Sequence, residues 1–203
     1  MFDGAGEWDI PIIEPEAWEP VEFIDFNRAM SAKRREDRGV HFFIDDYRFE
    51  RIWTDWKRYG AALAQFAACM TPDFSMFTDW PTAVQLWNHY RKHFIGAYLQ
   101  SLGVKVYPTI CWSDRCSYEW CFDGEPIGGC VAVSSVGTQK NKESKRLFID
   151  GYEAMLDRLK PETIIFYGDV PSECGGRVVQ VSPFQGRFNE VRTDGRQRRE
   201  QRC

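Results

Sequence analysis

Residues 130–167 read CVAVSSVGTQKNKESKRLFIDGYEAMLDRLKPETIIFY. An apolar run at Cys130–Val136 is followed by apolar residues at helical spacing from Phe148 to Leu159, and a second apolar run occupies Thr163–Tyr167. Pro161 ends the helical pattern, because proline lacks the N–H that a continuing helix needs. Two strands joined by a helix pair in parallel through a right-handed crossover. This unit therefore predicts an α/β protein.

The same alternation of strand and helix recurs along the rest of the chain. Further short apolar strands are predicted at His41–Ile44, Ala67–Met70, Val104–Trp112 (with Pro108 marking an edge or a bulge) and Val178–Val181. The repetition predicts a mostly parallel sheet with crossover helices, built as an open sheet or as a partial β/α barrel.

Two more helices are expected between these strands. Residues 49–66 have helical spacing with Gly60 as a break, and a second helix follows Asp79 as N-cap and Pro81 in its first turn, until Gly103 stops it. The large apolar side chains expected to be buried against the sheet are Trp87, Phe94, Phe148 and Tyr152.

The two ends of the 203-residue chain differ in charge. Residues 1–40 form an acidic, proline-containing arm, residues 41–183 the α/β domain, and residues 184–203 a basic tail that is predicted to be disordered. The net charge of −4 argues against a general nucleic-acid coat. A secretory signal and a spanning apolar segment are both missing from the sequence, which predicts a cytoplasmic protein that does not enter membranes.

Polar residues follow each predicted strand, at the edge where parallel sheets bind ligands. Asp45 and Asp73 are the candidate catalytic residues, as general acid and base or as ligands of a divalent cation. The other expected ligand-binding residues are Asp46, Ser75, Trp112, Ser134, Ser135, Gly137, Thr138, Tyr167 and Asp169. The alternative for each aspartate is a helix cap or a turn.

Within this set, the segment Ser134–Thr138 with Lys140 and Lys142 is a candidate anion-binding loop, because its amides and hydroxyls precede a helix. Trp112 and Tyr167 are candidate stacking walls. An ordinary polar loop with a hydroxyl cap is the alternative to the anion-binding loop.

Cysteines and histidines offer weaker metal signals. Cys111, Cys116, Cys121 and Cys130 lie within twenty residues but form no CxxC pair, so buried reduced thiols are favoured over a zinc site. His89 and His93 share one helix face, which we interpret as exposed histidines with Tyr90 and Phe94 on the buried side.

Several separated motifs also connect the chain to a known family. They are Phe42–Glu50 (FFIDDYRFE), Pro72–Ser75 (PDFS), Asn88–Arg91 (NHYR), Pro108–Trp112 (PTICW) and Tyr167–Gly168. Between Ile12 and Asp169 the chain resembles the family catalogued as domain of unknown function 4417, which occurs in bacteriophages, mobile elements and their hosts. The resemblance implies a phage or mobile-element origin, and its motifs coincide with the predicted strand ends.

These observations predict binding of a small or nucleotide-like ligand at the carboxyl ends of the strands, by a metal-assisted hydrolase or transferase. The sequence does not identify a cofactor, and a divalent cation held by the strand-end acids is the candidate that it offers. One alternative is a non-catalytic phage or mobile-element protein that engages a host factor. Another is a DNA-associated accessory factor that binds nucleic acid through the basic tail.

Overall fold

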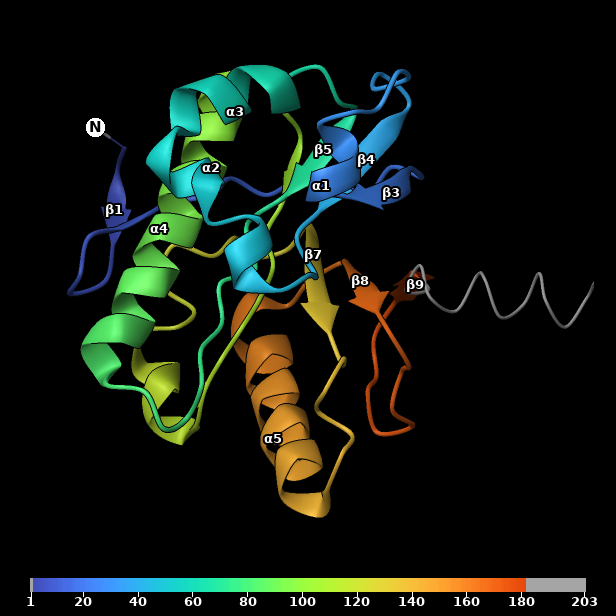
Figure 1. Ribbon diagram of the computed structural model, residues 1–203. Helices are drawn as coiled ribbons and strands as arrows, with labels where there is room; N and C mark the ends of the chain where they lie inside the picture. The colour runs from blue at the N-terminus through green and yellow to red at the C-terminus, as the bar shows by residue number, and fades with distance from the viewer. Residues whose placement is uncertain (1, 182–203) are drawn as a thin grey trace, which may run out of the picture.

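The computed structural model describes residues 2–181 and contains two parallel sheets (Figure 1). The first sheet has the order β3 (Glu22–Asp25), β4 (Arg38–His41), β5 (Ala68–Met70) and β6 (Val106–Tyr107). The second has the order β7 (Cys130–Ser134), β8 (Thr163–Tyr167) and β9 (Val178–Val181). Every ladder in both sheets is parallel, so the predicted α/β class is confirmed.

A short parallel bridge between Thr109 and Ala132 connects the two sheets. Ile110 N–H donates to the Ala132 carbonyl, and Ala132 N–H donates to the carbonyl of Pro108. The strands therefore follow one another in chain order from β3 to β9. The single long strand predicted at Val104–Trp112 is wrong, because Pro108 cannot donate to a ladder and β6 ends just before it.

Successive side chains of the strands point to opposite sides, as the pleat requires. Inward-facing residues of both sheets meet in one core: Phe23, Phe43, Ala68, Met70, Tyr107, Cys130, Ala132, Ile165 and Tyr167. The Phe43 and Tyr167 rings stack across it, with 4.8 Å between centroids. The sheets thus face each other as an incomplete barrel, in which no ladder joins β9 to β3 within residues 2–181.

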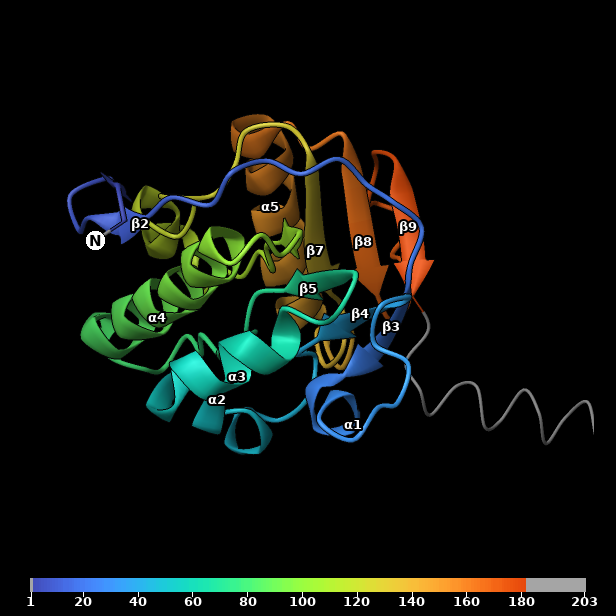
Figure 2. The ribbon, with the colours of Figure 1, turned by 90° about the horizontal axis from the view of Figure 1, so that it is seen from above.

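The helices pack on the outside of this barrel (Figure 2). They are α1 (Phe26–Ala29), α2 (Arg51–Thr54), α3 (Trp56–Leu63), α4 (Thr82–Ser101) and α5 (Lys142–Leu159). The first four cover the outer face of the first sheet through residues such as Phe26, Leu63 and Leu99, and α5 covers β7 and β8 through Phe148 and Tyr152. None of the helices in residues 2–181 has the length and apolar composition that crossing a bilayer requires.

Several helix and strand details differ from the prediction. Gly60 does not break a helix; it lies inside α3, where a Cβ atom would come within 2.5 Å of the Tyr98 ring on α4. The break falls at Asp55 instead, between α2 and α3. Strand β4 runs from Arg38 to His41 rather than from His41 to Ile44, because its partner β3 ends at Asp25, which pairs with His41.

The start and the orientation of α4 also differ. Pro81 is the N-cap, with no side-chain capping bond, so Asp79 does not cap the helix. Trp87 was expected in the core but is 47% exposed, because it lies on the outer side of α4, stacked on Tyr90. Phe148 and Tyr152 are buried, as predicted.

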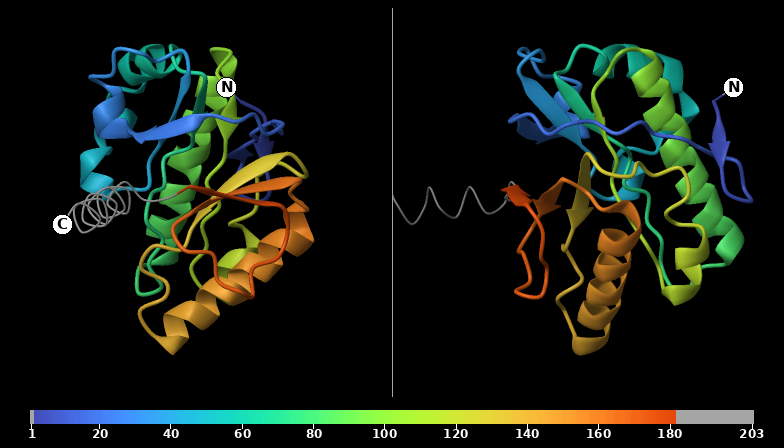
Figure 3. Two further views of the ribbon diagram at one scale, coloured as in Figure 1. Left: turned by 90° about the vertical axis from the view of Figure 1, so that its right-hand side faces the viewer. Right: turned by 180° about the vertical axis from the view of Figure 1, so that it is seen from behind.

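The N-terminal segment forms the small hairpin of β1 (Gly4–Ala5) and β2 (Ile10–Pro11), which lies beside α4 (Figure 3). Ile13 after it is buried, and β3 enters the first sheet. Residues expected in the acidic arm therefore contribute to the barrel. The basic tail at 184–203 lies outside the described residues.

Candidate functional site

The carboxyl ends of the strands surround a pocket of about 750 Å³. Its walls come from segments after β3, β4, β5, β7 and β8, which are far apart in the sequence. Of the residues predicted from the sequence, it brings together Asp45, Asp46, Asp73, Ser75, Ser134 and Tyr167. These six residues therefore line one pocket, while their role in binding or catalysis stays a prediction.

Asp73 lies between this pocket and a second one of about 470 Å³. Pro72 lies two residues after the end of β5, and the buried Phe74 anchors the segment that follows Asp73. Burial raises the pKa of Asp73 to about 6, against the opposing effect of the Cys111 thiol, which donates a hydrogen bond to its carboxylate. Such a carboxyl group exchanges a proton near neutral pH.

The other acids of the first pocket have different partners. Asp25 pairs with Arg28, and Asp45 is 3.5 Å from Arg48. Asp46 accepts hydrogen bonds from the amide and the hydroxyl of Ser75, which ties the loop after β4 to the loop after β5. Asp46 therefore holds the pocket wall, and the exposed Asp45 lies at its rim.

The floor of the first pocket is aromatic. His41, Phe43 and Tyr167 contact one another through their rings, with centroids 4.8–5.9 Å apart. Tyr47 and Phe77 also line the pocket and are 75% and 54% exposed. Exposed rings beside a polar pocket provide surfaces on which a planar group can stack.

The second pocket contains the predicted anion-binding loop. Gly137, Thr138 and Lys140 line it, together with Ser144 in the first turn of α5. Asn141 caps this helix by accepting a hydrogen bond from the Ser144 amide. A helix N-terminus beside a lysine and hydroxyl groups favours an anion.

Trp112 forms another wall of the second pocket. Its indole N–H donates to the Leu147 carbonyl at 3.2 Å, and its ring rests on Gly151 of α5. A Cβ atom at position 151 would lie only 2.1 Å from the indole nitrogen, so glycine is required there.

Two predicted ligand-binding residues line neither pocket. Ser135 is buried, and its hydroxyl donates to the backbone carbonyl of Asp169 at 2.6 Å. Asp169 is exposed beyond the end of β8. This bond fixes the loops after β7 and β8 to each other, a structural role that the sequence pattern alone does not distinguish from binding.

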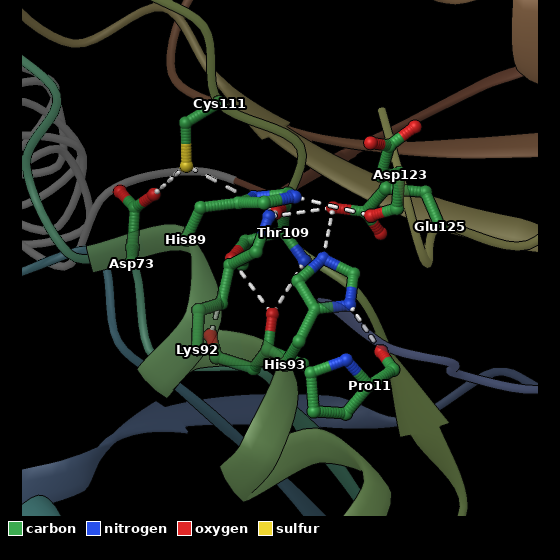
Figure 4. A network of polar contacts seen from close by, with 10 residues as sticks. Pro11, Asp73, His89, Lys92, His93, Thr109, Cys111, Asp123 and Glu125 are labelled. Atoms are coloured by element: carbon green, nitrogen blue, oxygen red, sulfur yellow. Dashed lines mark hydrogen bonds and ion pairs between the residues drawn. The ribbon is translucent and has the colours of Figure 1, made fainter. Parts of the chain in front are cut away.

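A buried polar network on α4 was not expected from the sequence (Figure 4). The ammonium of Lys92, 2% exposed, lies 2.5 Å from Glu125 Oε1 and 2.9 Å from the Thr109 carbonyl. His93 Nε2 lies 3.0 Å from the same carboxylate oxygen. Burial alone would raise the pKa of Glu125, but the charge of Lys92 holds it below its usual value.

The expectation that His89 and His93 are exposed is therefore wrong: their exposed fractions are 1% and 0%. The segment between β6 and β7 covers this face of α4 and supplies Glu125 and the Asp123 carbonyl. Gly124 makes the approach possible, because its φ is +73° and a Cβ atom would lie 2.7 Å from the Pro11 carbonyl. Because the covered face of α4 is rich in polar residues, its sequence is typical of an exposed face and did not predict burial.

The cysteines do not assemble into a zinc site within the described residues. Cys121 and Cys130 are buried free thiols, as favoured from the sequence, whereas Cys116 is exposed. The three-residue group His89, His93 and Glu125 is the one place in residues 2–181 where three metal-ligating side chains converge.

Comparison with known proteins places the chain in a family. The "Gene 1 protein" of Mycobacterium phage L5 is 38% identical over 171 residues, which is 83% of this chain and 75% of that protein. The "Gene 1 protein" of Mycobacterium phage D29 is 37% identical over 169 residues, 82% of this chain and 63% of that protein.

No solved structure matches the chain significantly. The family described as "Domain of unknown function (DUF4417)" matches residues 2–185, nearly the whole chain. The resemblance seen in the motifs is thereby confirmed, and the chain belongs to this family, with relatives encoded by mycobacteriophages.

Proposed function

We propose that the protein binds a nucleotide-like ligand across the two strand-end pockets, with Asp73 as the group that exchanges a proton with it. The observation that carries the proposal is the position of Asp73, partly buried between an aromatic pocket and a cation-lined one. A carboxyl group with a raised pKa in a cleft is a typical acid–base group.

The two pockets suit different parts of such a ligand. The first offers Tyr47 and Phe77 as stacking surfaces for a planar base. The second offers Lys140, Thr138 and the start of α5 for a phosphate group. Because the pockets share Asp73 and Ser134, one ligand of nucleotide size can occupy both.

The geometry gives less support to a reaction in which the strand-end acids hold a metal ion than to proton transfer by Asp73. Asp45 and Asp46 are engaged by Arg48 and Ser75, respectively. Within residues 2–181, these acids are not part of a three-residue metal-ligating group. We therefore assign Asp73 to proton transfer rather than to cation binding, in the transfer or hydrolysis of the bound ligand.

The test is a thermal-shift and calorimetric panel of adenosine, AMP, ATP and inorganic phosphate. We expect AMP or ATP to raise the melting temperature more than adenosine or phosphate alone, because only they occupy both pockets. Lys140→Ala should weaken nucleotide binding about tenfold, the equivalent of roughly 1.4 kcal/mol. Lys142→Ala is the matched control, because Lys142 is exposed and lines neither pocket.

Equal binding by the two lysine variants would contradict the phosphate assignment. A panel in which none of the compounds raises the melting temperature of the wild type would overturn the proposed ligand class, and the host-factor interaction protein would then become the leading account.

A further inference from the structure

The group His89, His93 and Glu125 has features that a purely structural ion-pair network does not explain. One ligand atom from each residue lies within 4.8 Å of the other two, and all three residues are buried. His89 and His93 lie one turn apart on α4, so their rings project in the same direction toward Glu125 (Figure 4).

Backbone carbonyls fix the orientation of both rings. His93 Nδ1 is 2.8 Å from the Pro11 carbonyl, and His89 Nε2 is 3.0 Å from the Asp123 carbonyl. A carbonyl only accepts, so these two nitrogens carry the protons. The opposite nitrogens, His93 Nε2 and His89 Nδ1, are then the ones that can bind a metal ion, as in histidines that a second shell orients around a metal.

Two atoms of the group have no hydrogen-bond partner within residues 2–181: His89 Nδ1 and Glu125 Oε2. A third atom, His93 Nε2, lies 3.0 Å from Glu125 Oε1, a contact in which it can donate only when the ring carries a second proton. Buried polar atoms without partners are costly, and a cation bound here would give the first two atoms a partner and take the place of the proton on the third.

We propose that His89, His93 and Glu125 bind a first-row transition-metal ion, with Zn²⁺ as the best match to two imidazoles and one carboxylate. This site goes beyond the proposed function and shares no ligand residue with the nucleotide pockets. Donor atoms around tetrahedral Zn²⁺ at about 2.0–2.1 Å lie roughly 3.4 Å apart, so the side chains must close slightly around the ion. Water would complete the coordination. The metal would cross-link the segment between β6 and β7, through Glu125, to α4, through His89 and His93.

Lys92 allows a test that distinguishes a metal site from a structural ion pair. Its ammonium bonds Glu125 Oε1, which leaves Oε2 for the ion, but its positive charge opposes a second cation nearby. Replacing Lys92 with methionine removes this repulsion and leaves the three ligands in place. A metal site therefore predicts that K92M binds the ion more tightly than the wild type, whereas a structural ion pair predicts only loss of stability.

The experiment is a titration of the chelator-treated full chain with Co²⁺, followed by visible absorption and by the metal content after gel filtration. We expect one Co²⁺ per chain in the wild type, loss of binding in His89→Gln, and at least tenfold tighter binding in Lys92→Met. His41→Gln is the control, because His41 is a buried histidine outside the group. It should bind Co²⁺ like the wild type.

Failure of the wild type to take up Co²⁺ would overturn the proposal. Unchanged uptake by His89→Gln would overturn it as well, because the ion would then be bound elsewhere, for example by the free thiols. Circular dichroism of each variant verifies folding. If His89→Gln does not fold, the comparison of wild type with Lys92→Met decides alone: weaker binding by Lys92→Met contradicts the site.

Discussion

The thiol of Cys111 donates a hydrogen bond to the carboxylate of Asp73, with 3.1 Å between Sγ and Oδ1. The two residues follow adjacent strands, β5 and β6, so the bond joins the segments after these strands at the wall of the second pocket. Burial raises the pKa of both groups, and the negative charge of Asp73 raises that of Cys111 further. Asp73 is thereby set to titrate near neutral pH.

Asp73→Asn should stabilise the protein at neutral and alkaline pH. The folded protein holds the Asp73 proton more tightly than the unfolded chain, whose carboxyl titrates near 3.9, so the wild type loses stability as the pH rises from about 4 to about 6. Asparagine removes this loss and can still accept from Cys111. Urea unfolding should show a gain on the order of 1–2 kcal/mol at pH 8 that vanishes near pH 4. A less stable variant at pH 8 would show that Asp73 is a capping or turn residue.

Glu125→Gln should destabilise the protein by about 3–5 kcal/mol, because it leaves the ammonium of Lys92 buried without a counter-charge. Glu50→Gln is the matched control, because Glu50 pairs with Arg91, the neighbour of Lys92 on α4. Glu50 pairs with Arg91 while 45% of its side chain stays exposed, so its loss should cost about 1 kcal/mol or less. Both free energies come from urea unfolding with chelator present. Equal losses of unfolding free energy in the two variants would mean that the buried pair of Lys92 and Glu125 stabilises the protein no more than the partly exposed pair does.

Gly151→Ala should displace Trp112 from the wall of the second pocket. The added methyl group would overlap the indole ring, which costs about 1–3 kcal/mol and shifts the tryptophan fluorescence. Gly175→Ala serves as the comparison, since a Cβ atom there meets nothing within 4 Å. It should leave stability within about 0.5 kcal/mol of the wild type. Similar losses in the two variants would argue against the close packing of Trp112 on α5.

The sequence predicts the parts of the fold that rest on local pattern. Strands at Thr163–Tyr167 and Val178–Val181 match the structure because their apolar runs end at turn residues. The pocket residues were found because parallel strands must end at the same edge. The division into two facing sheets was not predictable, since it depends on how Pro108 interrupts β6 and on the bridge at Thr109.

The buried network was missed for a physical reason. The face of α4 that carries His89, Lys92 and His93 has the composition of a solvated surface, and it is buried because a later segment, which supplies Glu125 33 residues after Lys92, covers it. Charge compensation between distant residues has no signature in helical periodicity. The one local clue is Gly124 beside Glu125, whose positive φ permits the close approach.

The central claim, that the ligand binds at the strand-end pockets around Asp73, is tested most directly by backbone amide NMR during titration with ATP. The account predicts that the largest shifts occur at Ser75, Ser134, Gly137 and Thr138, which line the pockets, and that Asp73→Asn reduces the affinity while these amides remain the ones that respond. Shifts confined to other parts of the chain, such as the basic tail or the outer faces of α3 and α5, would contradict it.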